Sequence, residues 1–367
     1  MFNATVPTTN TKMFLDPAGA VGVARYDRVK YPQFTKLFKR QNGFFWQPGE
    51  INCDRDAKDF RRFTDVAQHI FTSNIKRQIV LDTKQGRAIA AILAPITSLP
   101  ELDVFAQAWN YFEVIHGMSY THIIQSIYPN PTEILDSVLD IEPVMACLDS
   151  ISDPYDRLEY QNTLAKAVEF GLVPADQYSV YEHKKALWLC INAINALEGI
   201  RFYVSFACSW AFAELKQMEG NAKIIKLIAR DENLHLAASQ QIIKLLPLDD
   251  PDFAKIQKEC LDDVQKIFTD VVDQEITWAE YLFKDGSMIG LNAELLASYV
   301  KWIANKRMTA IGIETPFPGG SNPLPWTQKW ISGSDVQVAP QQVQVSSYVI
   351  AGYTKDISAD TFSNFEL

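Results

Sequence analysis

The sequence predicts an all-α protein, a bundle of long helices. Stretches in which apolar and polar residues alternate, as they do in strands, are scarce along its 367 residues. Long segments instead repeat apolar residues at helical spacing, and proline or glycine separates them. Two of these segments carry Glu-x-x-His pairs, Glu113/His116 and Glu232/His235. Because positions i and i+3 share one face of a helix, each pair can present an oxygen and an imidazole nitrogen to one point inside the bundle.

Length and composition indicate a soluble globular protein. A chain of 367 residues is long enough for one large domain or two ordinary ones, and its 47% hydrophobic content supports a sizeable core. The formal net charge is −10 and the pI is about 5.1. This acidic balance provides no basic surface for nucleic acid or for an anionic membrane, so we expect neither partner.

The cysteines and the N-terminus indicate a cytoplasmic protein. The cysteines are odd in number and widely spaced, and they form no Cys-x-x-Cys pair, which fits reduced, buried thiols: Cys53, Cys147, Cys190, Cys208 and Cys260. The first residues lack the charged start and apolar run of a signal peptide. Residues 188–213 are apolar enough to suggest a membrane span, but Glu198 and Arg201 lie near their middle. A buried helix is therefore the better interpretation.

The N-terminal half is expected to contain a lead-in and the first helices of the bundle. Residues 1–60 are interrupted by proline and glycine, and we expect them to pack on a main domain at 61–330. Residues 66–85 repeat apolar positions at helical spacing, and Gly86 is expected to end this helix. Asp82 lies in its last turns.

The next helix is predicted to begin with a capping box, Ser98-x-x-Glu101, and to continue until Pro129. It carries Glu113, His116 and Tyr120. Residues 132–181 are expected to form shorter helices, with breaks around Pro154 and Pro174.

The C-terminal half is predicted to contain four more helices. One covers residues 182–219 and ends at Gly220, and the next covers 221–246 and ends before Pro247. Their short connection predicts antiparallel neighbours. A third helix starts at Asp249-Asp250-Pro251 and stops at 284–286, and a fourth covers 292–310. Proline and glycine are frequent after Glu314, and residues 331–367 are predicted to be a flexible polar tail.

Two further acids complete a set of six metal-ligand residues. Asp82 precedes Glu113 by 31 positions, and Glu198 precedes Glu232 by 34, each in an otherwise apolar segment. One carboxylate from each of two helices and a Glu-x-x-His from each of two others form the inward-facing ligand set of di-iron carboxylate bundles. Four carboxylates offset the charge of two divalent ions and can bridge between them. A single such acid is often a surface residue, but the doubled pattern favours a metal site. Carboxylate and imidazole suit iron or manganese, whereas structural zinc sites more often recruit thiolates.

Tyr120 is a candidate redox residue. It follows His116 at i+4 and so lies on the metal-facing side of its helix. Phe202 and Phe206 follow Glu198 at helical spacing, as Ile224 and Ile228 precede Glu232, so we expect an apolar pocket around the phenol. Most buried tyrosines only satisfy their hydroxyl, and the metal neighbourhood is what favours an oxidisable role here.

Several strings resemble the radical-generating small subunit of class I ribonucleotide reductase. They cover nearly the whole chain: Leu81-Asp82 with Gln85-Gly86-Arg87, Glu113-x-x-His116-x-x-x-Tyr120, residues 195–208 around Glu198, residues 219–235, Asn322-Pro-Leu-Pro-Trp326, Val345-Ser-Ser-Tyr348 and the Ser363–Leu367 end. Other di-iron bundles share the ligands but lack this tail, so the similarity is specific.

The resemblance implies a ferritin-like fold, a homodimer and a di-iron centre that reacts with O2 to oxidise Tyr120 to a stable radical. Asp82, Glu113 and His116 would bind one iron ion and Glu198, Glu232 and His235 the other, with some carboxylates bridging. Manganese would accept the same ligands.

The resemblance also implies a path for the oxidising equivalent. His116, Asp231 and Trp46 would form a hydrogen-bonded relay from the metal to the surface, and Tyr348 in the tail would pass the equivalent to the large subunit, where ribonucleotides are reduced. Gln342 and Gln344 stand where similar proteins often carry acids, so a proton acceptor near Tyr348 is not assigned.

Three alternatives remain at this point. A ferritin-type iron store would use the same ligands but needs neither the tyrosine nor the tail. A di-iron oxygenase component would need an open substrate pocket where Tyr120, Phe202, Phe206 and Ile228 are expected to fill the space. A helical scaffold without enzymatic activity would leave six ligand-type residues unexplained.

Overall fold

The computed structural model describes residues 3–331, and that part of the chain is helical. It contains no strand, only isolated bridges between Phe14 and Thr97 and between Met288 and Leu291. The predicted all-α class is confirmed. Tyr348, Gln342, Gln344 and the apolar residues at the C-terminal end lie outside the described residues.

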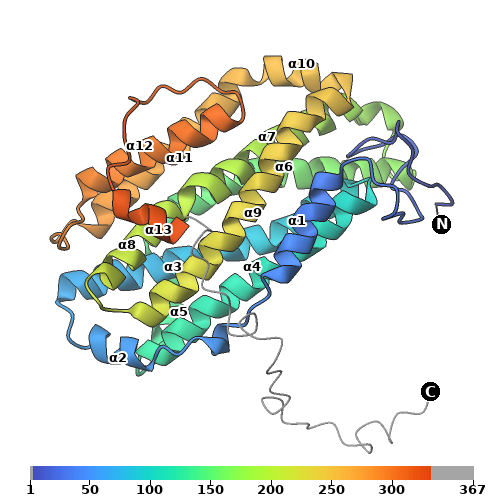
Figure 1. The fold of residues 1–367 in the computed structure, drawn as a ribbon. Coiled ribbons are helices and arrows are strands. Elements are labelled where there is room, and N and C mark those ends of the chain that lie inside the picture. Colours follow the sequence, from blue (N-terminus) through green and yellow to red (C-terminus); the bar gives the residue numbers. More distant parts are fainter. Residues whose placement is uncertain (1–2, 332–367) are drawn as a thin grey trace, which may run out of the picture.

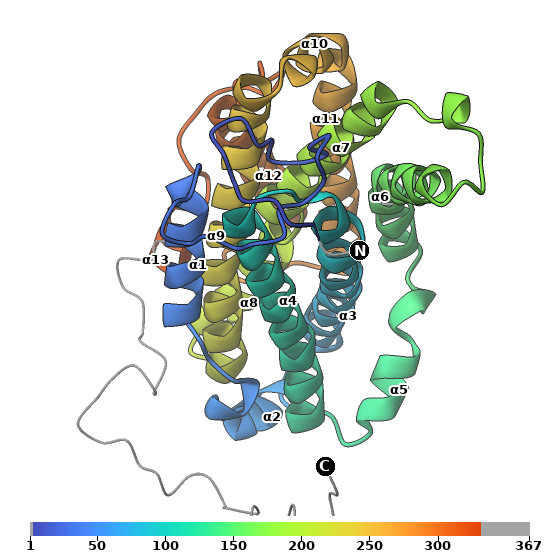
Figure 2. The ribbon, with the colours of Figure 1, turned by 90° about the vertical axis from the view of Figure 1, so that its right-hand side faces the viewer.

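Long helices lie side by side and form the body of the protein (Figures 1 and 2). The helices that enclose its centre are α3 (Asp65–Ala88), α4 (Pro100–Ile127), α6 (Glu142–Glu169), α7 (Val180–Ala196), α8 (Tyr203–Glu214) and α9 (Glu219–Asp249). Helix α3 packs on α4, α6 and α8, while α9 packs on α4, α7 and α8. Helices α11 (Leu261–Leu282) and α12 (Ala293–Ala310) pack on each other, and α11 also covers α7.

The shorter helices lie around this body. Helices α1 (Pro32–Gly43) and α2 (Asp54–Phe60) both pack on α4 and α9. Helix α5 (Pro131–Asp136) follows α4, α10 (Pro251–Glu259) packs on α7 and α9, and α13 (Gln328–Ile331) ends the described chain.

The prediction that Gly86 ends its helix is wrong. Helix α3 runs through Gly86 to Ala88 and continues as a π-helical segment, Ile89–Leu93. A Cβ atom at position 86 would lie 3.1 Å from the Cβ atom of Glu113. The missing side chain therefore lets α3 and α4 approach closely beside Glu113.

The predicted capping box at Ser98 is also wrong, although the helix it was meant to start is present. Helix α4 begins at Pro100, with Leu99 at the N-cap and no side-chain cap. The Ser98 hydroxyl accepts a hydrogen bond from the Asp16 amide at 3.1 Å. Glu101 accepts bonds from the backbone amides of Lys30 and Tyr31, both at 2.9 Å. Both side chains thus tie the N-terminal segment to the bundle.

Pro154 does not break its helix, contrary to the prediction. Helix α6 runs for 28 residues through this position. An internal proline costs about 3 kcal/mol. The neighbouring Ile151, Tyr155 and Leu158 are all buried against the core, and their burial offsets that cost. The predicted loop at Pro174 is confirmed.

The helix predicted for residues 182–219 is divided and ends earlier, at Glu214. Helices α7 and α8 flank a π-helical segment, Leu197–Arg201, which holds Glu198. Gly220 does not end a helix but lies inside the first turn of α9, at a point where a Cβ atom would come within 2.6 Å of the Asn52 carbonyl oxygen. Asp56 of α2 accepts hydrogen bonds from the amides of Gly220 and Asn221 at 3.1 and 2.6 Å and so caps α9.

Later boundaries match the predictions more closely. Asp250 accepts a hydrogen bond from the Asp252 amide at the start of α10, but the helix breaks at Cys260 before α11. Asn292 caps α12 by accepting from the Leu295 amide at 2.8 Å. The prediction that α9 ends before Pro247 is wrong, since this helix extends through Pro247 to Asp249.

Residues 188–213 are a buried part of the bundle. Their side chains are almost all inaccessible to solvent. Within residues 3–331, no helix combines the length and the apolar character that crossing a membrane requires.

Candidate metal centre

Four helical segments bring all six predicted ligand residues together. Helix α3 contributes one acid, α4 and α9 each contribute a Glu-x-x-His pair, and the π-helical segment Leu197–Arg201 contributes the last acid. Each residue is at most 1% exposed: Asp82, Glu113, His116, Glu198, Glu232 and His235. The two pairs face each other across the α4–α9 contact. His235 Nδ1 lies 3.0 Å from Glu113 Oε1, and His116 Nδ1 lies 3.1 Å from Glu232 Oε1.

The six residues form two overlapping groups. One contains Asp82, Glu113, His116 and Glu232, and the other contains Glu113, Glu198, Glu232 and His235. Within each group, the potential ligand atoms all lie within 4.8 Å of one another. Glu113 and Glu232 belong to both groups, so the geometry places these two carboxylates where they can bridge a pair of ions.

The donor atoms fit a pair of divalent cations. Each group has buried atoms that have no aligned hydrogen-bond partner among the described residues, including both carboxylate oxygens of Asp82, Oε2 of Glu198 and Nε2 of His235. A buried polar atom without a partner is costly, and metal ligation removes that cost. The donors are oxygen and imidazole nitrogen without a thiolate, a set that suits iron or manganese.

The pKa values of the buried acids and of His235 also favour binding of cations. Burial and the Glu113 carboxylate raise the pKa of Asp82 well above its ordinary value, and burial and Glu232 do the same to the pKa of Glu198. Although burial alone would lower it, the Glu113 and Glu232 carboxylates raise the pKa of His235 to about 9. A site that holds protons in this way without metal can exchange them for metal ions.

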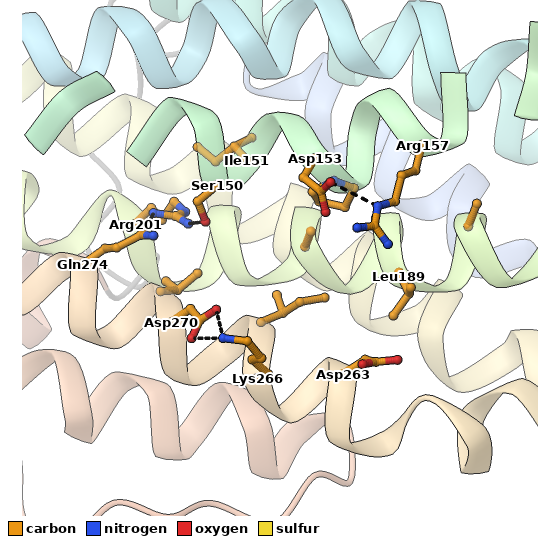
Figure 3. A pocket seen from close by; sticks show the side chains of 15 residues that line it. Ser150, Ile151, Asp153, Arg157, Leu189, Arg201, Asp263, Lys266, Asp270 and Gln274 are labelled. Atoms are coloured by element: carbon orange, nitrogen blue, oxygen red, sulfur yellow. Dashed lines mark hydrogen bonds and ion pairs between the residues drawn. The ribbon is translucent and has the colours of Figure 1, made fainter. Parts of the chain in front are cut away.

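Arg201 anchors the segment that carries Glu198. Its guanidinium donates from Nη1 to Gln274 Oε1 of α11 at 2.7 Å and to Cys147 Sγ of α6 at 2.9 Å. Nη2 donates to the Ser150 hydroxyl at 3.1 Å (Figure 3). Arg201, Ser150 and Gln274 lie at one end of a cavity of about 440 Å³ between α6, α7 and α11. A π-helical turn inserts an extra residue into a helix, and here α6 and α11 hold it in place.

Tyr120 is fully buried on α4, one turn after His116. Its hydroxyl has no aligned hydrogen-bond partner in the described chain. Burial, and then the nearby Asp82 carboxylate, raise the pKa of Tyr120 well above its ordinary value. The apolar side chains expected in this region are also fully buried: Phe202, Phe206, Ile224 and Ile228.

Hydrogen bonds connect His116 to Trp46. His116 Nε2 lies 3.4 Å from Asp231 Oδ2, and the Trp46 indole N–H donates to the same oxygen at 2.8 Å. The Trp46 and His116 rings stack with centroids 6.5 Å apart. Trp46 is 0% exposed, so this connected set ends beneath the surface rather than at it.

Sequence comparisons identify the family of the chain. The family model described as "Ribonucleotide reductase, small chain" matches residues 24–323. Ribonucleoside-diphosphate reductase 1 subunit beta of Escherichia coli O157:H7 is 45% identical over 353 residues, which cover 95% of this chain and 94% of that protein. The chain belongs to the family of ribonucleotide reductase small chains.

Solved structures share the fold of this small chain. The ribonucleotide reductase R2 subunit from Clostridium botulinum superposes with a TM-score of 0.75 at 24% identity, covering 88% of this chain and 94% of that one. The dimanganese(II)-NrdF of Streptococcus sanguinis superposes with a TM-score of 0.68 at 18% identity, covering 84% and 99%. The expected ferritin-like bundle and the assignment as a ribonucleotide reductase small subunit are confirmed. The iron store, the oxygenase component and the scaffold are therefore set aside.

Sequence reasoning missed two side chains that contact candidate ligand residues. The Trp109 indole donates to Glu113 Oε1 at 2.9 Å and stacks on His235 with centroids 5.0 Å apart. The Gln85 amide donates to Glu198. Trp109 precedes Glu113 by four residues and Gln85 follows Asp82 by three, so helical spacing alone could have pointed to both.

Proposed function

We propose that this small subunit holds two metal ions per chain, which react with O2 and oxidise Tyr120 to a stable radical that serves ribonucleotide reduction in the large subunit. One observation carries the proposal. Two ligand groups share Glu113 and Glu232 in a fully buried site, and an oxidisable phenol lies one turn from His116. When bound, the metal ions would contribute electrons to the reduction of O2 and would supply the oxidising power that removes an electron and a proton from the phenol.

The side chains around the metals have distinct tasks. Asp82 and His116 would hold one ion, Glu198 and His235 would hold the other, and Glu113 and Glu232, which belong to both groups, would be shared between them. Trp109 orients Glu113 through its hydrogen bond. The burial of Tyr120 keeps solvent away from the phenoxyl oxygen, which favours a long-lived radical. We propose iron as the metal, while manganese suits the same donors and is the metal of the dimanganese(II)-NrdF from Streptococcus sanguinis.

The test of this function is spectroscopic. Metal-free protein receives Fe(II) under argon and is then exposed to O2. We expect a tyrosyl signal in the electron paramagnetic resonance spectrum and an iron content near two per chain. A protein that binds iron and consumes O2 without forming an organic radical would contradict the proposal.

We further propose that His116, Asp231 and Trp46 relay the oxidising equivalent toward the large subunit. Their hydrogen bonds give a continuous path through buried groups, and Asp231 Oδ2 connects the other two residues. Tyr348, in the tail outside the described residues, would receive the equivalent once the tail is docked.

Two changes separate the tasks of the tail. The apolar Phe362, Phe365 and Leu367 lie in an otherwise polar segment, a pattern typical of docking into a groove of a partner. Deleting residues 360–367 should abolish association with the large subunit, measured by surface plasmon resonance, and leave the radical intact. Tyr348→Phe should preserve association and the radical but stop turnover. Normal binding by the truncated protein, or full activity of Tyr348→Phe, would show that this role of the tail is wrong.

We also propose that the subunit is a homodimer that forms through α4. Tyr111, Val114 and Met118 are 45%, 49% and 54% exposed and follow one another at i, i+3 and i+7. They form an apolar stripe on the side of α4 opposite Glu113 and His116. The ring of Phe45 stacks on Tyr111 with centroids 6.3 Å apart and extends the stripe. An exposed apolar stripe on a central helix favours contact with a second copy.

A charge within this stripe tests the dimer. Val114→Asp places a carboxylate at the centre of the stripe, so we expect the mass in solution, measured by light scattering, to fall from dimer to monomer. Leu172→Asp is the matched control, because Leu172 is apolar and 77% exposed but lies in the loop after α6. A Val114→Asp protein that stays dimeric would place the interface elsewhere.

A reducing, cytoplasmic location completes the proposal. It is supported by the five cysteines, all of which are buried and free.

A further inference from the structure

A buried chain of hydrogen bonds reaches Glu198 from the side of α6. The Tyr155 hydroxyl donates to Gln85 Oε1 at 2.6 Å, and Gln85 Nε2 donates to Glu198 Oε1. The exposed fractions of Tyr155, Gln85 and Glu198 are 2%, 0% and 0%. The chain therefore links α6, α3 and the π-helical segment without contact with solvent.

The chemistry of the three groups sets the direction of these bonds. An ionised carboxylate only accepts hydrogen bonds, so the amide of Gln85 must present its NH2 group to Glu198. Its carbonyl oxygen then faces Tyr155, whose hydroxyl can donate to it. The opposite orientation of the amide would place its oxygen against the carboxylate oxygen, with repulsion between two acceptors. The Tyr155 hydroxyl thus stabilises the one amide orientation that donates to Glu198.

The bond from Gln85 makes the two oxygens of Glu198 unequal, with Oε2 the one that is free of hydrogen bonds to the described residues. Oε1 is occupied by the amide, while Oε2 has no hydrogen-bond partner in the described part of the chain and lies 3.9 Å from His235 Nδ1. Glu198 belongs to only one of the two ligand groups, the one with His235. Its orientation should therefore affect one ion and not the other.

Tyr155 is itself held in place. Its ring packs in the core, and the Lys84 ammonium lies 5.7 Å from the ring centroid. Lys84 also forms an ion pair with Asp156 at 3.3 Å. These contacts come from α3 and α6, so the hydroxyl has a defined position relative to Gln85.

We propose that Tyr155 is a positioning residue that acts through Gln85: it orients the Glu198 carboxylate and so strengthens binding of the metal ion on the Glu198/His235 side. This inference rests on the proposed metal centre. Groups that orient metal ligands commonly contribute about 10–100-fold to metal affinity, which is the size of effect expected here.

Titration of metal-free protein with Mn(II), with free Mn(II) followed by electron paramagnetic resonance, measures each binding step without O2 chemistry. Tyr155→Phe and Gln85→Met should each lower the affinity for one of the two Mn(II) ions by about 10–100-fold and leave the affinity for the other unchanged. The double variant should bind like Gln85→Met alone, because the hydroxyl has no amide left to orient. A merely structural tyrosine would give additive losses.

Tyr128→Phe is the matched control. The Tyr128 hydroxyl forms a 2.6 Å hydrogen bond with Thr72 Oγ1. Thr72 lies on α3, as Gln85 does, but among the described residues it contacts no candidate ligand residue in this way. The Tyr128→Phe protein should bind two Mn(II) ions like the unaltered protein. Gln85→Glu provides a further variant of the same shape in case Tyr155→Phe does not fold. It keeps the acceptor for Tyr155 but opposes Glu198 with a second carboxyl, and should weaken the same ion.

The outcomes separate this inference from the proposed function. If the unaltered protein fails to bind two Mn(II) ions, both the metal centre and the role of Tyr155 are overturned. Suppose that the unaltered protein binds two ions. The role of Tyr155 alone is then overturned if Tyr155→Phe binds both ions equally well. It is also overturned if Tyr155→Phe weakens binding in the Gln85→Met background as much as it does in the unaltered protein. If the Tyr155→Phe protein does not fold, the Gln85→Glu protein provides the test. Binding of both Mn(II) ions with unchanged affinity by Gln85→Glu would then overturn the role of Tyr155.

Discussion

Tyr120→Phe is expected to eliminate the organic radical and reduce ribonucleotide reduction to background, while the metal site still assembles. The substitution removes the only oxidisable hydroxyl on the metal-facing side of α4 near His116 and leaves all six ligand side chains in place. The hydroxyl has no aligned hydrogen-bond partner in the described structure, so its removal should change the free energy of unfolding by less than about 1 kcal/mol. The measurements are the paramagnetic resonance spectrum after Fe(II) and O2, iron content, and turnover with the large subunit.

Tyr299→Phe is the matched control for this substitution. Tyr299 is also 0% exposed, and its hydroxyl likewise lacks an aligned partner among the described residues, but it lies on α12, which carries none of the six candidate ligand residues. This variant should keep both the radical and turnover. A radical that persists unchanged in Tyr120→Phe would assign the oxidised residue elsewhere.

Glu232→Ala is expected to have the largest effect on metal binding. Its carboxylate belongs to both ligand groups, with Oε1 3.1 Å from His116 Nδ1 and Oε2 3.0 Å from His235 Nδ1. Removing it takes a donor from each ion and leaves two imidazoles facing a void. The Fe(II) titration should therefore end at no more than one ion per chain, and no radical should form.

Asp82→Ala provides the comparison, because Asp82 belongs to one group only. It should lose the ion on the His116 side and retain the ion held by Glu198 and His235. If both variants still bound two ions, the six residues would not be the ligand set. If Asp82→Ala lost both ions and Glu232→Ala lost only one, the assignment of the bridging carboxylate would be wrong.

The sequence by itself determined the helical class and the six residues of the candidate site. Both depend on local geometry. Apolar periodicity reports which side of a helix is buried, and the i, i+3 spacing of Glu113 with His116 and of Glu232 with His235 places each pair on one face whatever surrounds it. The resemblance to the ribonucleotide reductase small subunit came from the sequence motifs around these two pairs and around Asp82 and Glu198.

Only the tertiary structure decided features that depend on the distance between helices. Glycine commonly marks the end of a helix, yet Gly86 and Gly220 both lie inside helices. Glycine is needed at these positions because the Glu113 side chain and the Asn52 carbonyl oxygen lie where a Cβ atom would stand. Pro154 remains helical because the residues around it are buried against other helices.

The same reason applies to the site. Which carboxylates are shared between the two ligand groups depends on how α4 meets α9, and the bond from Tyr155 to Gln85 joins residues 70 positions apart in the sequence. Spacing along the chain encodes which side chains share a face of one helix. The distances between side chains on different helices arise from packing the whole core, so the bridging carboxylates and the groups that orient them appear only in the folded protein.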